Sequence, residues 1–320
     1  MVCKEVQWII VNYIWFNQYN AIMDFRLKVF VTVATRLSFT KAATELFITQ
    51  PAVSKHIQEL EEEYKVKLFD RTSSTISLTQ AGEQLVKHAK SIFEIYREID
   101  FEMGALIKEQ YGLLRLGAST TISQYIIPPL LARFHQEMRG VKVTLRNGNT
   151  EQIESALLDK EIETGIVEGH SKNKAIKYRP FLKDELVLVC KRTNPLVNKG
   201  EITKEEFLQL RFLMREQGSG TLEVIEHALK PLKIKMSELI VEMELGSTES
   251  IKSYLMNSNC VAFISIHAIG KELKNNELFV LDVYNLVIER YFYIISLQGK
   301  TNAISDLLIK NISKYYNLKL

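Results

Sequence analysis

The chain has 320 residues, of which 46% are hydrophobic and 25% are charged, and its formal net charge is +3. This composition excludes a disordered or fibrous protein and indicates a globular chain with room for two or three domains. The small net charge excludes a strong overall attraction to nucleic acid, so any DNA-binding surface must come from local segregation of charge. The wide spacing of Cys3, Cys190 and Cys260 indicates a reducing cytoplasm and neither a disulfide framework nor a zinc site.

Residues 1–22 contain a short apolar patch, from Trp8 to Phe16, that Asn12 interrupts. The patch is too short for a membrane-spanning helix. No small-residue cleavage site follows it, so a signal peptide is not expected. We interpret the segment as an N-terminal extension, with Met23 as a candidate start of translation. The alternative is a weak membrane or partner contact.

Residues 23–78 have the pattern of three short helices followed by a β-hairpin. Apolar residues recur at three- and four-residue steps in the first helix, and Ser38 and Thr49 stand where the N-caps of the next two helices belong. Pro51 falls in the first turn of the third helix, where its missing N–H would have no partner anyway. Two short apolar runs, 68–69 and 76–78, predict the hairpin, or wing.

The second and third helices meet the requirements of a helix-turn-helix. Ala42 and Ala43 are small where two helices would cross, and Phe47 and Ile48 make the inside of the turn apolar. The third helix offers polar side chains outward, and its N-terminal end is expected in the major groove. Taken singly, these are ordinary solvated residues, but together they favour DNA binding. The expected DNA contacts are Arg36, Ser38, Thr40, Lys41, Thr49, Gln50, Pro51, Ser54, Lys55, Gln58 and Arg71.

Three glutamates, Glu61, Glu62 and Glu63, end the third helix. They would repel phosphate, so we expect them to face solvent. The third helix is therefore not basic along its whole length. Phosphate contacts are expected to be spread over several cations of two subunits.

Residues 79–110 predict a single long helix that Thr79 caps. Apolar residues recur every seventh position, and a second set fills an adjacent seam. Such a repeat is typical of a helix that packs on a partner helix, so we predict a homodimer through this helix, with packing inside the chain as the alternative. The two sets are Leu78, Leu85, Ile92, Ile99 and Leu106, and Ala89, Tyr96 and Met103.

Residues 111–320 alternate short apolar strands with helical segments. This alternation predicts an α/β region with partly parallel sheets. Strands are expected at 113–116, 141–145, 164–167 and 186–190, and helices at 122–137 and 152–158.

The chain resembles the LysR-type transcriptional regulators in five runs that follow one another in order: 38–43, 49–57, 60–61, 68–71 and 78–82. The resemblance implies a multidomain protein with an all-α winged helix-turn-helix (23–78), a linker helix that dimerises (79–110) and a two-lobed α/β effector-binding domain (111–320) similar to periplasmic solute receptors. Lobe I is expected at about 111–184 and 266–320, and lobe II at about 185–265. The family's tetramers imply a homotetramer, and RNA polymerase is left open as a further partner.

Two residues bear on how closely DNA reading follows the family. The family more often has arginine where this chain has Lys55, and lysine keeps the charge but loses the two-pronged fork. Phosphate contact is therefore favoured over guanine reading at this position. Arg71 resembles the family residue that reaches the DNA backbone or the minor groove.

Polar loops open three predicted helices of the α/β region. Each is more often a helix cap than a ligand site, but three in one region favour a shared pocket for a small anion. Glu168, at the end of a strand, could accept an ammonium group or be a surface carboxylate, and both interpretations stay open. The candidate effector contacts are Ser119, Thr120, Thr121, Arg146, Asn147, Glu168, Gly218, Ser219, Gly220, Thr221 and Thr248.

Residues 118–128 and 218–221 resemble the family branch associated with cysteine and sulfur metabolism. This resemblance implies a small anionic or zwitterionic effector, such as sulfate or an acylated serine. A solute receptor without DNA binding is the rival interpretation, which the helix-turn-helix and the missing export signal oppose. An enzyme is not expected, because the six histidines show no metal spacing and no nucleophile stands in a recognisable triad. We therefore predict a cytoplasmic regulator without cofactor, whose partners are a double-stranded DNA operator and an effector.

Overall fold

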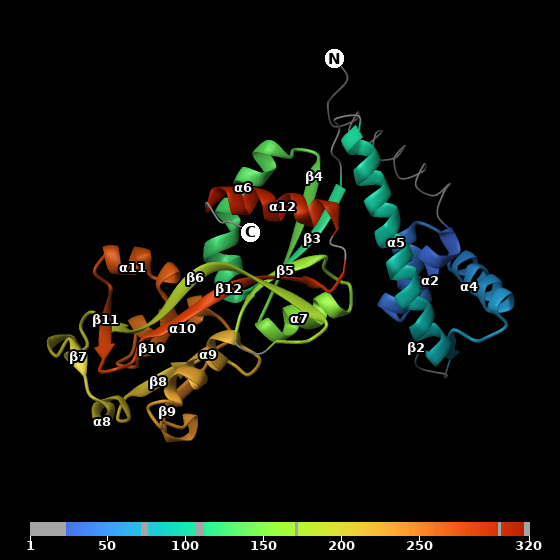
Figure 1. Ribbon diagram of the computed structural model, residues 1–320. Helices are drawn as coiled ribbons and strands as arrows, with labels where there is room; N and C mark the ends of the chain where they lie inside the picture. The colour runs from blue at the N-terminus through green and yellow to red at the C-terminus, as the bar shows by residue number, and fades with distance from the viewer. Residues whose placement is uncertain (1–23, 72–75, 107–111, 170–171, 300–301, 317–320) are drawn as a thin grey trace, which may run out of the picture. The chain divides into compact units, whose positions relative to one another are not determined.

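The computed structural model describes residues 24–71, 76–106, 112–169, 172–299 and 302–316. It divides into two compact units, residues 1–96 and 97–320, which we describe separately (Figure 1). The expectations for residues 1–22 lie outside the described residues.

The first unit contains the helix-turn-helix and its wing. Helices α2 (Phe25–Arg36), α3 (Phe39–Leu46) and α4 (Gln50–Tyr64) precede strands β1 (Phe69–Arg71) and β2 (Ile76–Leu78), which pair antiparallel. The hydroxyls of Ser38 and Thr49 accept hydrogen bonds from backbone N–H groups of the helices that they cap, as predicted. The core contains Ala42 and Ala43, together with Val53, Ile57 and Leu60 of α4.

Two expectations for this unit are wrong. Phe47 is 88% exposed, because it ends α3 in the left-handed conformation (φ 54°), which turns its side chain out while Ile48 packs on the core. Glu61 is 7% exposed instead of solvated. Its carboxylate accepts hydrogen bonds from Lys67 Nζ (2.6 Å) and the Leu68 backbone N–H (2.9 Å), so it fastens α4 to the start of the wing.

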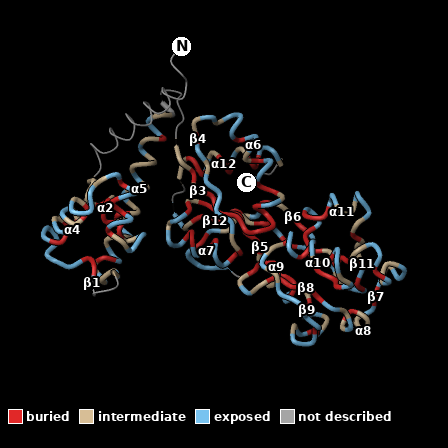
Figure 2. The backbone as a smooth tube through the Cα atoms, turned by 180° about the vertical axis from the view of Figure 1, so that it is seen from behind, coloured by how far each residue is buried: buried red, intermediate tan, exposed pale blue. Residues whose placement is uncertain are grey.

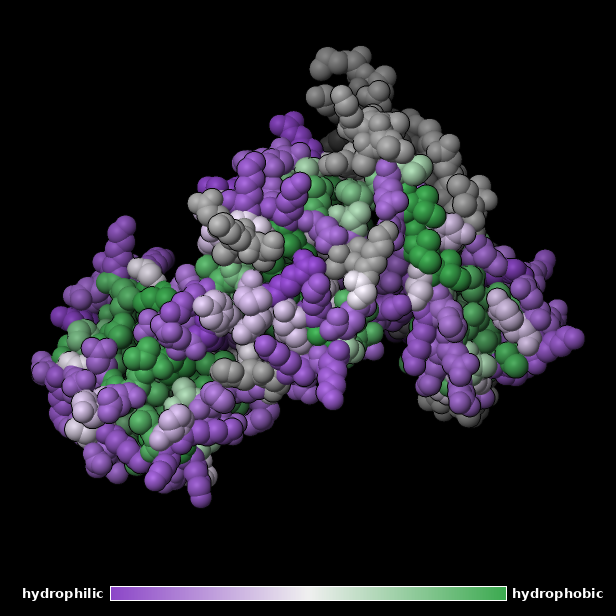
Figure 3. Space-filling model, in the orientation of Figure 1, coloured by the Kyte–Doolittle hydropathy of each residue, from purple (hydrophilic) through white to green (hydrophobic). Residues whose placement is uncertain are grey.

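Helix α5 (Gln80–Leu106) begins after Thr79, whose hydroxyl accepts a hydrogen bond from the Gly82 N–H at 3.0 Å. Ala89 is fully buried in the helix-turn-helix core, which corrects its place in the predicted seam. The apolar residues that stay exposed are spaced by three and four and so share one face, visible as a hydrophobic stripe in Figure 3: Ile92, Ile95, Ile99 and Met103. The side chain of Leu106 lies outside the described ones.

The second unit is built on a mixed sheet with the order β4-β3-β5-β12-β6-β11-β7, and β10 also pairs with β6. Strand β3 is parallel to β4 and β5, whereas β12 is antiparallel to β5 and β6. Strands β8 and β9 form a separate parallel pair. The strands are β3 (Gly112–Ser119), β4 (Val141–Gly148), β5 (Thr164–Glu168), β6 (Ile176–Lys191), β7 (Glu201–Ile202), β8 (Arg211–Met214), β9 (Ile240–Glu244), β10 (Ala262–Ser265), β11 (Leu278–Val283) and β12 (Ile288–Leu297).

Helices cover this framework in two lobes joined by the long strands β6 and β12. Lobe I has η1 (Ile122–Ile126), α6 (Ile127–Glu137), α7 (Thr150–Leu158) and α12 (Ala303–Tyr315). Lobe II has η2 (Pro195–Asn198), α8 (Lys204–Phe207), α9 (Gly220–Leu229), η3 (Met236–Glu238), α10 (Thr248–Met256), η4 (Ile266–Ala268) and α11 (Gly270–Lys274). Each lobe has its own core, and the buried residues follow the strands in Figure 2.

The predicted lobe boundary near residue 266 is too early. Ala268, Leu278 and Ile288 all pack in the cores of lobe II. The physical reason is that β11 pairs antiparallel with the far half of β6, at residues 188–191. The chain returns to lobe I only within β12, where Phe292 and Ile294 enter the lobe I core. Among the described helices, none is long and apolar enough to cross a membrane.

Candidate functional site

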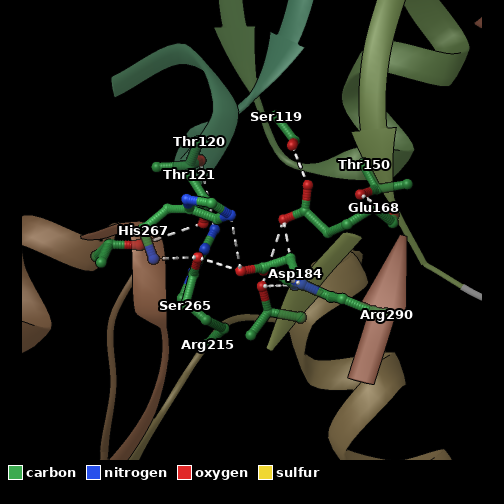
Figure 4. A network of polar contacts seen from close by, with 12 residues as sticks. Ser119, Thr120, Thr121, Thr150, Glu168, Asp184, Arg215, Ser265, His267 and Arg290 are labelled. Carbon is green, nitrogen blue, oxygen red and sulfur yellow. Dashed lines mark hydrogen bonds and ion pairs between the residues drawn. The ribbon is translucent and has the colours of Figure 1, made fainter. Parts of the chain in front are cut away.

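A cluster of buried polar side chains lies where β3 and β5 of lobe I end and α9 and α10 of lobe II begin (Figure 4). Six of the predicted effector residues meet there, and each is at most 5% exposed: Ser119, Thr120, Thr121, Glu168, Thr221 and Thr248. We call this cluster, together with Thr150, Asp184, Arg215, Ser265, His267 and Arg290, the cleft network.

Glu168 occupies the middle of the cleft network. It is 2% exposed, so the alternative of a surface carboxylate is wrong. Its carboxylate accepts hydrogen bonds from the hydroxyls of Ser119 and of Thr221, the latter at 3.3 Å. Its backbone carbonyl accepts a hydrogen bond from Thr150 Oγ1 at 2.7 Å. The residue therefore ties three segments together through neutral hydroxyl donors.

Asp184 and Arg290 form a buried ion pair that the sequence analysis missed. They are direct partners in the β6–β12 register, and Arg290 Nε lies 2.7 Å from Asp184 Oδ2. Arg290 Nη1 donates to Thr221 Oγ1 at 2.8 Å, and Ser265 Oγ donates to Asp184 Oδ1 at 2.7 Å. Both residues stand beside other charged residues of their strands, Lys183, Glu185 and Glu289, so no local sequence signal singled them out.

Arg215 follows β8 and is 3% exposed. Its Nε and Nη2 donate to the carboxylate of Glu216 at 2.8 and 3.0 Å, and its Nη2 also lies 3.4 Å from Thr120 Oγ1 of lobe I. Burial raises the pKa of Glu216, but the hydrogen bonds and charge of Arg215 outweigh this and hold it below its ordinary value. The guanidinium therefore stays paired with an ionised carboxylate while it reaches across to the other lobe.

Three buried polar atoms of this region have no hydrogen-bond partner within the described part of the chain: Arg215 Nη1, Arg290 Nη2 and Ser219 Oγ. Buried polar groups in proteins almost always have a partner, and leaving one unpaired costs roughly 1–3 kcal/mol. All three can donate a hydrogen bond. The arrangement can therefore accommodate an acceptor, such as an oxygen atom of an anion.

Glycines shape the loop that precedes α9. Gly218 has φ +80°, a conformation that other residues adopt only with strain. A Cβ atom on Gly220 would lie 2.1 Å from the backbone oxygen of Glu168, so only glycine allows α9 to begin this close to the end of β5. These two glycines are thus required by the backbone, and they bring Ser219 and Thr221 to the cleft network.

Direct hydrogen bonds hold the two lobes against each other. Asn149 caps α7 with its Oδ1 and donates from Nδ2 to the Gln217 carbonyl at 3.2 Å, and the Glu151 N–H donates to the Gly218 carbonyl at 3.2 Å. A cavity of about 810 Å³ beside these contacts is lined by both lobes and reaches Arg215 and Ser219. Glu168 and Arg290 are not among the residues that line this cavity.

A second contact between the lobes lies on Tyr125 of η1, whose hydroxyl donates to Glu249 of α10. Lys252 lies 2.9 Å from Glu249 and 2.7 Å from Glu272. Burial lowers the pKa of Lys252, but the hydrogen bonds to the two glutamates outweigh this and raise it above its ordinary value. Lys252 thus stays charged and holds the glutamate that Tyr125 contacts.

Besides Gly218, Ser219 and Gly220 at the start of α9, two further predicted effector residues are not part of the cleft network. Arg146 is exposed and pairs with Glu161, which holds its guanidinium away from the cluster. Asn147 is exposed as well, and its Oδ1 accepts a hydrogen bond from Ser123 Oγ at 2.9 Å. Asn147 therefore reaches the cleft network only through η1.

The predicted DNA contacts whose side chains are described are exposed in the first unit, except Ser38 and Ser54, which are half-buried. Gln50 Nε2 donates to Ser54 Oγ at 3.0 Å, so these side chains share one face of α4 as expected. The Lys55 side chain is 77% exposed and 3.9 Å from Glu59. Gln58 donates to Glu62, and Arg36 pairs with Glu45. The side chain of Arg71 lies outside the described ones.

Among the residues that the structure describes, no group of three or more His, Cys, Asp or Glu side chains could hold a metal ion. The winged helix-turn-helix and the two-lobed domain with its buried polar cluster define a DNA-binding regulator that carries an effector domain. Residues 25–83 match the family model "Bacterial regulatory helix-turn-helix protein, lysR family", and residues 108–310 match the model "LysR substrate binding domain". The chain belongs to the LysR family of transcriptional regulators.

Individual relatives cover most of the chain. The regulator CysL of Bacillus subtilis is 30% identical over 82% of this chain and 87% of its own length. The activator CmpR of Synechocystis is 33% identical over 87% and 90%. The structure of the Synechocystis CcmR regulatory domain in complex with 2-PG has a TM-score of 0.58 and 31% identity, and covers 63% of this chain and 96% of that domain. Because differently named regulators match about equally well, the predicted cysteine and sulfur branch stays a prediction.

Proposed function

We propose that this regulator binds a small effector with an anionic group inside the cleft network, and that the effector controls DNA binding by holding the lobes together. The observation that carries the proposal is the set of buried donors without an acceptor, on Arg215, Ser219 and Arg290. Hydrogen bonds to charged groups contribute about 1.5–3 kcal/mol each, so an anion that satisfies two of them gains useful affinity.

The position of these donors explains how an effector can act as a switch. Arg215 belongs to lobe II but lies 3.4 Å from Thr120 of lobe I, and Arg290 lies on a strand that joins the lobes. An anion bound to both arginines contacts the closed arrangement and loses contacts when the lobes part. It therefore favours closure by its difference in affinity for the two states. The CcmR regulatory domain, solved in complex with 2-PG, supports ligand binding by a domain of this kind.

Calorimetric titration of the full-length protein tests this proposal with sulfate, thiosulfate, phosphate and O-acetyl-L-serine. At least one should bind, and Arg215→Met should weaken that binding about tenfold or more, because each 1.4 kcal/mol is a factor of ten. Arg146→Met is the matched control, since it removes an exposed arginine that pairs with Glu161. Unchanged binding by Arg215→Met, or no binding of any of these ligands to the wild-type protein, would overturn the proposal.

The proposal assigns the operator contacts to the exposed polar face of α4. Lys55 lies next to Gln50 and Ser54 at the helix end that would enter the major groove. Lys55→Ala should weaken operator binding at every sequence and lower the slope of log affinity against log salt by about one, as expected for a phosphate contact. Lys142→Ala, an exposed lysine of β4, should leave both unchanged. Loss of discrimination between operator variants in Lys55→Ala would instead assign base reading to this lysine.

The exposed apolar stripe of α5 supports a homodimer through this helix. Pairs of dimers would form the homotetramer that the sequence resemblance implies, with RNA polymerase as a further partner. A regulator of DNA acts in the cytoplasm and has no need to turn over its effector, so we propose neither an enzymatic activity nor a cofactor. Turnover of any bound effector would contradict this assignment.

A further inference from the structure

Glu168 has a buried carboxylate, and none of the described side chains places a cation at hydrogen-bonding distance from it. Its nearest cationic atom among the described side chains is Arg290 Nη1, at 3.9 Å from Oε1. That nitrogen donates to Thr221 Oγ1 at 2.8 Å, and it is the Thr221 hydroxyl that donates to Glu168. Burying a carboxylate is unfavourable unless a charge compensates for it, and neutral hydroxyls do so only in part.

Counting the carboxylates and arginines of the cleft network shows the same imbalance. Asp184 neutralises Arg290, and Glu216 neutralises Arg215. The charge of Glu168 is left over. An effector with anionic groups alone would place a second uncompensated negative charge in a buried site. A zwitterionic effector adds no net charge: its cation lies beside Glu168, and its anionic group meets the arginine nitrogens that have no acceptor among the described residues.

The side chain of Arg290, which lacks a hydrogen-bond acceptor, lies next to the carboxylate of Glu168, which lacks a cation at hydrogen-bonding distance among the described side chains. Arg290 carries an unpartnered Nη2, and its other terminal nitrogen is 3.9 Å from Glu168. A ligand that serves both must have an anionic and a cationic group only a few bonds apart. In an α-amino acid, three bonds of about 1.5 Å or less link the ammonium nitrogen to a carboxylate oxygen.

We propose that the effector is a free α-amino acid or a side-chain derivative of one. Its ammonium group binds Glu168, and its carboxylate accepts hydrogen bonds from Arg290 Nη2 and Arg215 Nη1. Its side chain is then free to extend toward Ser219 and the cavity of about 810 Å³ that this serine lines. This inference rests on the proposed function, because it concerns the same cleft, and it narrows the effector to a zwitterionic class.

A pair of ligands that differ only in the amine tests the assignment. The common L-amino acids and O-acetyl-L-serine are screened on the full-length protein by thermal shift. The tightest ligand is then compared by calorimetry with the 2-hydroxy acid that carries the same side chain. The amino acid should bind about 10- to 100-fold more tightly, the range expected for a hydrogen-bonded charge pair.

Glu168→Gln should remove that difference, weakening the amino acid by the same factor while leaving the hydroxy acid bound as well as before or better. Glu168→Asp, which keeps the charge, should retain part of the preference. Glu289→Gln is the matched control, because it removes an exposed carboxylate from the residue next to Arg290. Thermal unfolding and hydrogen exchange establish that each variant is folded.

The outcomes separate this inference from the proposed function. If a hydroxy acid or sulfate binds as tightly as any amino acid, the cleft takes an anion and the amino-acid assignment is wrong. If folded Glu168→Gln weakens both ligands equally, Glu168 supports the site without contacting an amine, and the assignment is again wrong. If neither anions nor amino acids bind the wild-type protein, the proposed function itself fails.

Discussion

The buried pair between Asp184 and Arg290 should be a main determinant of how firmly the two strands that join the lobes hold together. Both side chains are at most 2% exposed, and Nε and Oδ2 are 2.7 Å apart. Breaking a buried ion pair by removing one partner typically costs about 3–5 kcal/mol, because a charge is left uncompensated. Asp184→Asn keeps an oxygen that can still accept from Ser265, so we expect the lower end of that range, about 3 kcal/mol.

Hydrogen exchange of peptides from β6 and β12 measures this effect in the intact protein. A loss of about 3 kcal/mol should speed exchange there roughly 100-fold, because each 1.4 kcal/mol is a factor of ten. Arg290→Met alone should have a similar effect. The double variant should recover much of the protection, because it removes both charges and leaves neither unpaired.

The neighbouring cross-strand pair provides the control. Lys183 precedes Asp184 on β6, and Glu289 precedes Arg290 on β12. These two residues form an ion pair, and both side chains are 55% exposed. Glu289→Gln should therefore change exchange little, since exposed ion pairs contribute little. If Asp184→Asn exchanges no faster than Glu289→Gln, or if the double variant shows the sum of the two single losses, the reasoning about this pair is refuted.

Three further predictions concern the wing, the α9 loop and the linker helix. Glu61→Gln should destabilise the first unit by about 1–3 kcal/mol at pH 7. Burial raises the pKa of Glu61, but Lys67 and the backbone outweigh this and lower it. The wild-type advantage should therefore be present at neutral pH and be lost as the pH falls through the lowered pKa, and equal urea midpoints at pH 7 would contradict this. Gly220→Ala should push α9 off the end of β5 and weaken effector binding in calorimetry, whereas unchanged affinity would show that the loop can shift. Ile99→Asp should convert dimers to monomers in sedimentation equilibrium, and an intact dimer would exclude the stripe on α5 as its interface.

Much of the molecule could be predicted from sequence because it depends on neighbours along the chain. The caps at Ser38, Thr49 and Thr79 rest on side chains that bond backbone groups within the next three residues. A local pattern contains both partners of such a bond. The strand and helix pattern of residues 113–167 followed for the same reason. The cluster of hydroxyls at 119–121 was likewise predictable, because polar residues follow an apolar strand there.

Other features required the tertiary structure because their partners are far apart in sequence. Arg290 and Asp184 meet only because β12 lies against β6, and Arg215 reaches Thr120 only because the lobes face each other. The burial of Glu168 depends on the same contacts.

The errors have the same origin. The pattern of apolar residues placed Ala89 in a dimer seam, whereas packing placed it in the helix-turn-helix core. The late return to lobe I within β12 depends on β11 pairing with the far half of β6. The sequence by itself thus determined the helix-turn-helix, the long helix and the alternating α/β pattern. The tertiary structure decided which charges face one another inside the cleft, because no local rule relates residues that pairing between distant strands brings together.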